Sequence, residues 1–136
     1  GDLGVWENGL FRDLFAMGLP SASDSLYRDG WLYNPYSALL DHIGLPQVSA
    51  ITVNQISTDI RQIDWYKKQW NPMLESMEGA ALHLACLQQQ IPFLQLRAVS
   101  NQVGVRDKSR WQLTASIESL NKKLIELFQQ VNDLPL

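Results

Sequence analysis

The sequence has little of what marks secreted, membrane or nucleic-acid-binding proteins. Its 136 residues include one cysteine, Cys86, which has no partner for a disulfide within the chain. A net charge of −3 lacks the basic excess that binds nucleic acids or anionic membranes. No apolar run approaches the roughly 18 residues of a membrane-spanning helix. We therefore expect a cytoplasmic protein without nucleic-acid or membrane partners.

Motifs for metal, cofactor and phosphate chemistry are also missing. His42 and His83 have no companions at metal-ligand spacing, and no glycine-rich phosphate loop occurs. Cys86 lies among small apolar residues, which is typical of a buried structural thiol rather than a reactive one. We expect neither a metal nor a cofactor.

What remains is the composition of an ordinary globular domain, with 46% hydrophobic and 18% charged residues. A chain of this length can bury roughly two thirds of the surface that its unfolded form exposes. It contains no internal repeat and no linker long enough to divide domains. We expect residues 1–136 to belong to a single domain.

Alternating strand and helix patterns favour an α/β fold, in which helices pack on a sheet. Residues 93–99 are almost continuously apolar, as in a strand that is covered on both faces. Further strands are predicted at residues 31–33, 48–56 and 74–76. Helices are predicted at residues 37–42, from the cap signal at Asp59 to about Trp70, and at residues 78–90.

The two ends of the chain carry further signals. Leu10, Phe11, Leu14 and Phe15 have helical spacing, and residues 19–29 have the composition of a loop. Near the other end, residues 109–112 fit a capping box that begins at Ser109. The apolar stripe from Leu113 to Val131 then predicts an amphipathic helix of about five or six turns, packed on the sheet.

Polar side chains follow two of the predicted strands. Met77 and Glu78 come directly after the strand that ends at Ser76, and Asn101 comes after residues 93–99. Open α/β sheets bind ligands just outside the carboxyl ends of their strands, so these positions predict a site. Taken alone, Glu78 also fits a helix-start residue that caps its own backbone, Met77 fits core filling, and Asn101 fits a turn-former.

Arg97 alternates with Gln95 on one face of the predicted buried strand. A buried charge needs a partner. Either an ion pair with a carboxylate of a neighbouring strand or a role near a reaction centre would supply one, and the residues alone favour neither.

Two motifs in order carry a family resemblance. Residues 76–81, SMEGAA, followed by residues 97–101, RAVSN, resemble the nucleoside phosphorylase and nucleosidase superfamily. Among its members they look most like the futalosine hydrolases, which remove hypoxanthine from futalosine in menaquinone biosynthesis. The resemblance implies a three-layer α/β/α sandwich, a small-molecule nucleoside substrate and a homo-oligomer.

The resemblance also implies roles for the candidate residues. The acidic residue of the first motif, here Glu78, binds the ribose hydroxyls, and Met77 packs against the sugar. Asn101 supports the departing purine where nucleosidases for 6-aminopurines carry Asp. An amide cannot supply a proton, but it can both donate and accept hydrogen bonds, which suits a 6-oxopurine such as hypoxanthine.

One part of the superfamily pattern has no counterpart. Its early glycine-rich loop and its water-activating acid are not matched, and Gly1 falls at a point resembling the middle of a family sequence. We therefore expect the C-terminal portion of a nucleosidase domain, without its N-terminal strands and without full catalytic competence. A phosphorylase, with Arg97 as its phosphate-binding candidate, and a non-catalytic nucleoside-binding or assembly remnant are the alternatives.

Overall fold

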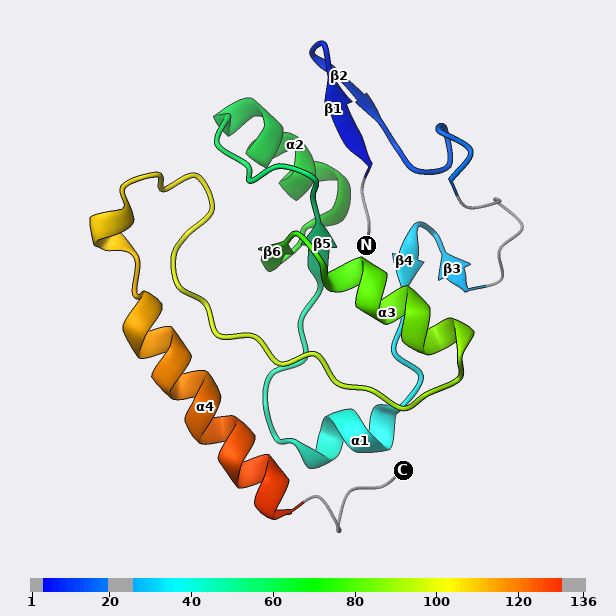
Figure 1. Ribbon diagram of the computed structural model, residues 1–136. Coiled ribbons are helices and arrows are strands. Elements are labelled where there is room, and N and C mark those ends of the chain that lie inside the picture. The colour runs from blue at the N-terminus through cyan, green and yellow to red at the C-terminus, as the bar shows by residue number, and fades with distance from the viewer. Residues whose placement is uncertain (1–3, 20–25, 131–136) are drawn as a thin grey trace.

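The computed structural model describes residues 4–19 and 26–130, which form a mixed α/β structure (Figure 1). This confirms the predicted mixture of strands and helices. The elements in chain order are β1 (Val5–Glu7), β2 (Leu10–Arg12), β3 (Tyr27–Arg28), β4 (Trp31–Leu32), α1 (Ser37–His42), β5 (Ala50–Thr52), α2 (Ile60–Trp70), β6 (Leu74–Ser76), α3 (Gly79–Gln88), the 3₁₀ turn η1 (Lys108–Arg110) and α4 (Leu113–Gln129).

The parallel pair of β5 and β6 lies at the centre of the fold (Figure 1). Its register places Ala50 opposite Leu74 and Thr52 opposite Ser76. Successive side chains of a strand point to opposite faces. On one face, Ile51 is buried in a cluster with Tyr66 of α2. On the other, the Thr52 hydroxyl accepts a hydrogen bond from the first turn of α3. Helices α2 and α3 therefore cover opposite faces of β5.

The boundaries of α2 are those that the sequence predicts. Asp59 caps its start by accepting a hydrogen bond from the backbone N–H of Arg61 at 2.9 Å. Asn71 ends the helix in the left-handed conformation, with φ of 43°, and Pro72 follows. Helix α1 is likewise confirmed, and Gly44 after it has a φ of 65°.

Two β-hairpins precede the central pair, where the spacing of residues 10–15 predicts a helix. That prediction is wrong, because β1 and β2 form an antiparallel pair around Asn8 and Gly9. Both turn residues have positive φ, 51° and 76°, as a type I′ hairpin turn requires. Asp29 and Gly30 repeat this geometry between β3 and β4. The loop predicted at residues 19–29 therefore includes a strand at its end, and residues 20–25 lie outside the described ranges.

An aromatic cluster joins the first hairpin to α2. Its members are Trp6, Phe11, Trp65, Tyr66 and Trp70, and the closest ring centroids, those of Phe11 and Trp65, are 4.7 Å apart. Tyr66 is 3% exposed, and its hydroxyl accepts hydrogen bonds from Trp6 Nε1 and Gln62 Nε2, both at 2.9 Å. Burial raises the pKa of Tyr66, and these two hydrogen bonds oppose the rise. The cluster is thus stabilised by the hydrogen bonds of the Tyr66 hydroxyl as well as by the burial of its aromatic rings.

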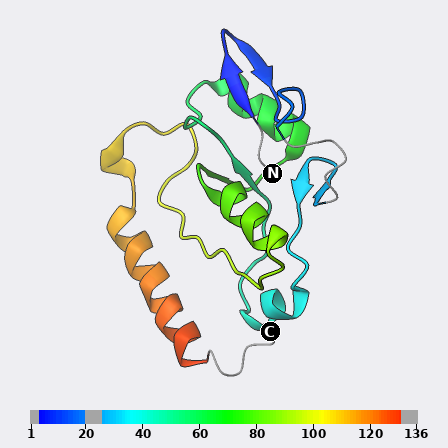
Figure 2. The same ribbon diagram turned by 45° about the vertical axis from the view of Figure 1, so that its right-hand side comes forward.

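Two predicted strands are shorter or absent in the described chain. Residues 48–56 form a strand only at Ala50–Thr52, and residues 93–99 form none. In both ribbon views the chain between α3 and η1 runs extended past the centre without an arrow (Figure 2). The cause is pairing, since an extended apolar segment becomes a strand only when another backbone lies beside it.

Helix α4 begins without the capping box predicted at residues 109–112. The Asp107 carboxylate caps η1 by accepting hydrogen bonds from the N–H and the hydroxyl of Ser109, so this hydroxyl is not free to cap α4. Gln112 precedes α4 and makes no side-chain cap. In residues 4–19 and 26–130, no helix is long and apolar enough to cross a membrane.

The predicted amphipathic character of α4 is confirmed only in part. Leu127 is buried, and Leu120 and Leu124 are half-buried. Leu113 and Ile117, which the predicted stripe includes, are exposed, and Val131 lies outside the described ranges. The helix is held to the extended segment by hydrogen bonds to the backbone carbonyls of residues 99 and 100. It therefore packs on that segment rather than on a sheet.

The hydroxyl of Tyr66 gives a direct test of the aromatic cluster. Tyr66→Phe leaves the part-buried indole N–H of Trp6 without its acceptor, so we expect a loss of about 1–2 kcal/mol in the free energy of unfolding. Urea denaturation followed by tryptophan fluorescence measures it. Tyr33→Phe is the matched control, because Tyr33 is 55% exposed. Equal stability of the two variants would contradict the role assigned to this hydroxyl.

Candidate functional site

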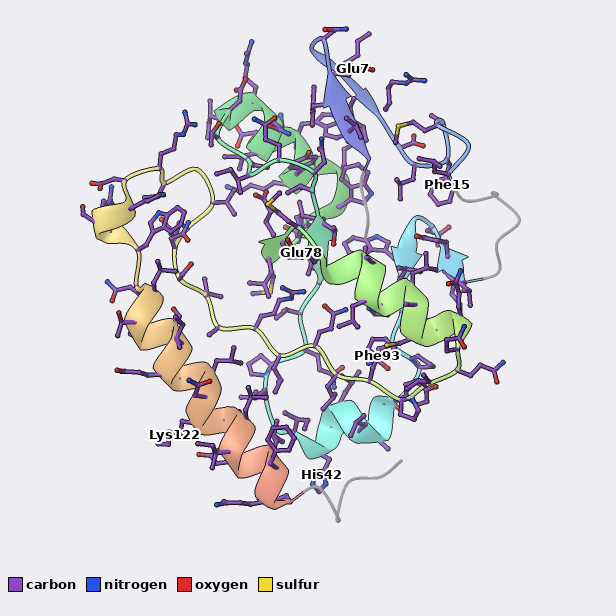
Figure 3. All side chains as sticks on the ribbon, in the orientation of Figure 1. Glu7, Phe15, His42, Glu78, Phe93 and Lys122 are labelled. Carbon is purple, nitrogen blue, oxygen red and sulfur yellow. The ribbon has the colours of Figure 1, made fainter. Side chains whose placement is uncertain are left out.

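The candidate site lies where β6 passes into α3. Strand β6 ends at Ser76, Met77 and Glu78 follow, and α3 begins at Gly79. Figure 3 shows Glu78 at this junction. Glu78 is exposed and makes no side-chain capping bond, so its carboxylate has no hydrogen-bond or ion-pair partner among the described residues. Met77 beside it is 46% exposed. Both side chains are therefore accessible to a ligand.

The first turn of α3 favours negative charge. Unpaired N–H groups and the helix dipole give this end a partial positive charge. Thr52 Oγ1 accepts from the N–H of Ala80 at 2.8 Å, which ties this turn to the end of β5. A carboxylate at this position is stabilised and keeps its oxygens free, and two such oxygens can accept both hydrogens of a diol.

Arg97 is tied to the same turn through one intermediate residue. Its Nη2 donates to Gln95 Oε1 at 2.8 Å, and Gln95 Nε2 donates to the carbonyl of Gly79 at 2.8 Å. The predicted common face of Gln95 and Arg97 is thus confirmed. Arg97 is exposed and forms no ion pair with a described carboxylate. A buried arginine would have required such an ion pair, but an exposed one does not.

Gly79 allows this close approach. A Cβ at this position would lie 2.8 Å from Ser76 Oγ, 2.9 Å from Arg97 Nη2 and 3.2 Å from Gln95 Oε1. Real Cβ atoms do not approach heavy atoms closer than about 3 Å without displacement. A Cβ at residue 79 would therefore push the side chains of Ser76 and Arg97 aside, a constraint that the sequence motif alone did not reveal.

Asn101 is occupied by its sequence neighbours. Its Oδ1 accepts from the Ser100 hydroxyl at 2.7 Å, and its Nδ2 donates to the carbonyl of Gln102 at 2.9 Å. No hydrogen bond joins it to Glu78 in the described chain. The structure thus brings Arg97 to the turn that follows Glu78, whereas Asn101 lies on the loop beyond with its amide engaged.

Glu75 has a role that its sequence context did not predict. Its Oε1 accepts from the backbone N–H of Ser57 at 2.9 Å, which fixes the connection between β5 and α2. Ser57 is 2% exposed, and its hydroxyl is buried without a hydrogen-bond partner in the described chain. An acidic residue inside a three-residue strand was the only sequence signal for this contact.

A cavity of about 740 Å³ lies beside the junction. Its walls are α1, residues 45–50, one face of β5 and β6, the start of α3 and the extended segment. Arg97 and Gln95 line it, but Glu78 and Asn101 do not. Within the described ranges, no group of three His, Cys, Asp or Glu side chains could hold a metal ion.

His83 on α3 closes one side of this cavity. Its ring meets the edge of Phe93, with centroids 4.6 Å apart, and its Nε2 is buried without a partner in the described chain. Burial lowers the pKa of His83, and a hydrogen bond to the backbone of Tyr33 opposes the fall. The neutral imidazole is therefore the form that the fold favours.

Three curated proteins with the name futalosine hydrolase match the chain. The protein from Thermus thermophilus is 32% identical over 126 residues, which are 90% of this chain and 56% of that protein. The protein from Acidothermus cellulolyticus is 27% identical over 88% of the chain and 49% of its own length. The protein from Streptomyces coelicolor is 40% identical over 48 residues. The chain spans about half the length of the first two. No protein-family model and no solved structure matches it.

Replacement of Gly79 tests the close approach at α3. Alanine is the better helix former by about 1 kcal/mol, but here its Cβ would displace Ser76 and Arg97. The three nearest atoms are all ends of side chains that can move aside, so we expect Gly79→Ala to lower the free energy of unfolding by no more than about 1 kcal/mol, the low end of an overpacking effect. In a Ser76→Ala background, where the nearest overlap is gone, the loss should shrink. A Gly79→Ala variant as stable as the original chain would contradict the contact.

His83 predicts how stability depends on pH. Its pKa in the folded chain lies below the value of about 6.5 in the unfolded chain. As the pH falls below about 6.5, the unfolded chain binds a proton before the folded chain does, so stability is full above this pH and decreases below it. Urea midpoints at pH 7.5 and pH 5 should differ less in His83→Gln than in the original chain. The exposed His42→Gln serves as the control and should leave the difference unchanged.

Proposed function

We propose that this chain, which is similar to proteins named futalosine hydrolase, is part of a nucleosidase that hydrolyses the N-ribosidic bond of futalosine. The products would be hypoxanthine and dehypoxanthine futalosine, an intermediate of menaquinone biosynthesis. Similarity along 90% of the chain to a protein of that name carries this proposal. Because the chain covers only about half of these relatives, the activity is proposed for the enzyme to which it contributes.

We propose that residues 1–136 form the C-terminal part of a three-layer α/β/α domain. The support is the central parallel pair, since α2 and α3 cover opposite faces of β5. A ligand site outside the carboxyl ends of β5 and β6 is the arrangement that open parallel sheets share. The family resemblance adds a homo-oligomer and a small-molecule nucleoside as the partners.

Glu78 is proposed to bind the ribose. Its carboxylate is exposed, has no partner in the described chain and lies at the positive end of α3. The two ribose hydroxyls would each donate to one carboxylate oxygen, and Met77 would pack against the sugar. Arg97 is included among the substrate-binding residues because its guanidinium lies against Gly79, the residue after Glu78.

Asn101 is proposed to support the leaving purine. The C–N bond breaks with its electron pair moving onto the base, which leaves an oxocarbenium-like sugar; the oxygen of water bonds to the anomeric carbon, and the proton that this water loses ends on the released hypoxanthine. The Asn101 amide would donate to N7 or O6 and accept from N1–H, which a 6-oxopurine offers. To do so it must exchange its contacts with Ser100 and Gln102 for contacts with the base. The group that activates water has no candidate among these residues.

Binding and turnover of futalosine together test this proposal. Titration calorimetry reports binding even where turnover needs residues outside this chain. We expect Glu78→Gln to weaken futalosine binding by about 10- to 100-fold, because a hydrogen bond to a charged group contributes about 1.5–3 kcal/mol. Asn101→Ala should weaken hypoxanthine binding. Glu118→Gln, an exposed carboxylate on α4, is the matched control and should bind as the original chain does.

The controls separate the alternatives. Inosine and methylthioadenosine, used in place of futalosine, show whether the chain distinguishes the base and the tail of its substrate. Assays with and without phosphate distinguish a hydrolase from a phosphorylase. Hypoxanthine release that requires phosphate would replace hydrolysis with phosphorolysis. Binding without release under any condition would support a nucleoside-binding remnant or an incomplete enzyme. Equal futalosine affinity of Glu78→Gln and the original chain would refute the ribose site.

A further inference from the structure

Gln95 joins the extended segment to the candidate site through both ends of its amide. Its Oε1 accepts a hydrogen bond from Arg97 Nη2 at 2.8 Å, and its Nε2 donates to the carbonyl of Gly79 at 2.8 Å. A guanidinium has only donors and a carbonyl only accepts, so one orientation of the amide satisfies both groups. The side chain at this position must therefore accept and donate at once. Glutamate could only accept there, lysine could only donate, and methionine could do neither.

The Arg97 guanidinium lies where the charges around it do not hold it. Its Nη2 is 2.9 Å from the point that a Cβ of Gly79 would occupy, beside the first turn of α3. The N-terminal end of a helix carries a partial positive charge, which disfavours a cation. No carboxylate among the described residues forms an ion pair with Arg97. In the described chain, the neutral amide of Gln95 is thus the hydrogen-bond partner that fixes the guanidinium.

This arrangement leaves two opposite charges near each other and unpaired. Glu78, the residue before Gly79, has an exposed carboxylate, and the Arg97 guanidinium uses an uncharged acceptor in its place. An exposed ion pair would add little stability and would occupy both groups. With Gln95 as the acceptor, the carboxylate and most N–H donors of the guanidinium stay available to a ligand.

We propose that Gln95 is a positioning residue, which holds the Arg97 guanidinium beside the first turn of α3 so that Arg97 and Glu78 bind one substrate together. This role rests on the proposed function, in which the substrate is futalosine. Gln95 acts through Arg97 rather than on the substrate, because the oxygen and the nitrogen of its amide are both engaged within the chain.

Three substitutions at residue 95 separate the placement of Arg97 from the support of α3. Glutamate keeps the acceptor for Arg97 and loses the donor for Gly79, lysine does the reverse, and methionine loses both. Slow rotation of the Arg97 guanidinium in nitrogen-15 NMR spectra of the free chain reports that it is held. We expect slow rotation in the original chain and in Gln95→Glu. In Gln95→Lys and Gln95→Met, rotation should be about tenfold faster, the factor that one charge-assisted hydrogen bond corresponds to.

The opposite order would overturn the proposal. If Gln95 served only to hold the extended segment against α3 through Gly79, the spectra of Gln95→Lys would resemble those of the original chain and the spectra of Gln95→Glu would not. Equal rotation rates of Arg97 in the original chain and in Gln95→Met would also overturn it. The exposed Arg106 is the reference in each spectrum, and urea midpoints establish that each variant is folded.

Titration calorimetry with futalosine tests whether this placement serves the proposed substrate. We expect Gln95→Met to weaken binding about tenfold and Arg97→Met to weaken it by at least as much. In an Arg97→Met background, Gln95→Met should have no further effect, because the guanidinium that Gln95 positions is gone. Gln88→Met, at an exposed glutamine of α3, is the matched control and should bind as the original chain does.

Two kinds of failure are distinguishable. Additive losses of affinity from Gln95→Met and Arg97→Met would overturn the positioning role and leave futalosine as the substrate. A lack of futalosine binding by the original chain would instead overturn the proposed substrate, and the Arg97 spectra decide independently whether Gln95 holds the guanidinium.

Discussion

The fold depends on covering a very small parallel sheet on both faces. Three residues of β5 pair with three of β6, and a ladder of this length cannot be stable without packing. Parallel strands occur almost only where helices cover both faces. The aromatic cluster on α2 supplies apolar burial on one side, and the bond from Ala80 to Thr52 fixes α3 on the other. The position of Glu78 follows from this constraint, since it joins β6 to α3.

The Glu78 side of the candidate site is fixed by hydrogen bonds across the fold, whereas Asn101 is held only by its neighbours in sequence. Glu78 has the place that its neighbours in sequence predict, because a strand end and a helix start define it locally. Arg97 and Gln95 reach the same turn across the fold, which the alternation of the strand hinted at but could not locate. Asn101 makes neutral hydrogen bonds, each with a net contribution of about 1 kcal/mol. A ligand with good acceptors can therefore replace these contacts at small cost.

Sequence patterns predicted elements well where the deciding interaction is local. Asp59 and Asn71 bound α2 because a side-chain cap and a left-handed residue act within a few positions. Ser109 shows the limit of this approach, since Asp107, two residues earlier, captures its hydroxyl. Residues 93–99 show the other limit. Their apolar pattern predicts a strand that is covered on both faces. It does not predict whether another backbone lies beside these residues, and a strand forms only where one does.

That conflict between pattern and structure is informative in itself. In natural sequences, local preference and global fold agree nearly everywhere, so a strongly strand-like segment without a partner is an exception to that agreement. Open strand edges are also the surfaces that recruit other strands. Residues 93–99 and the residues that flank β5 are where the apolar pattern and the observed ladder disagree.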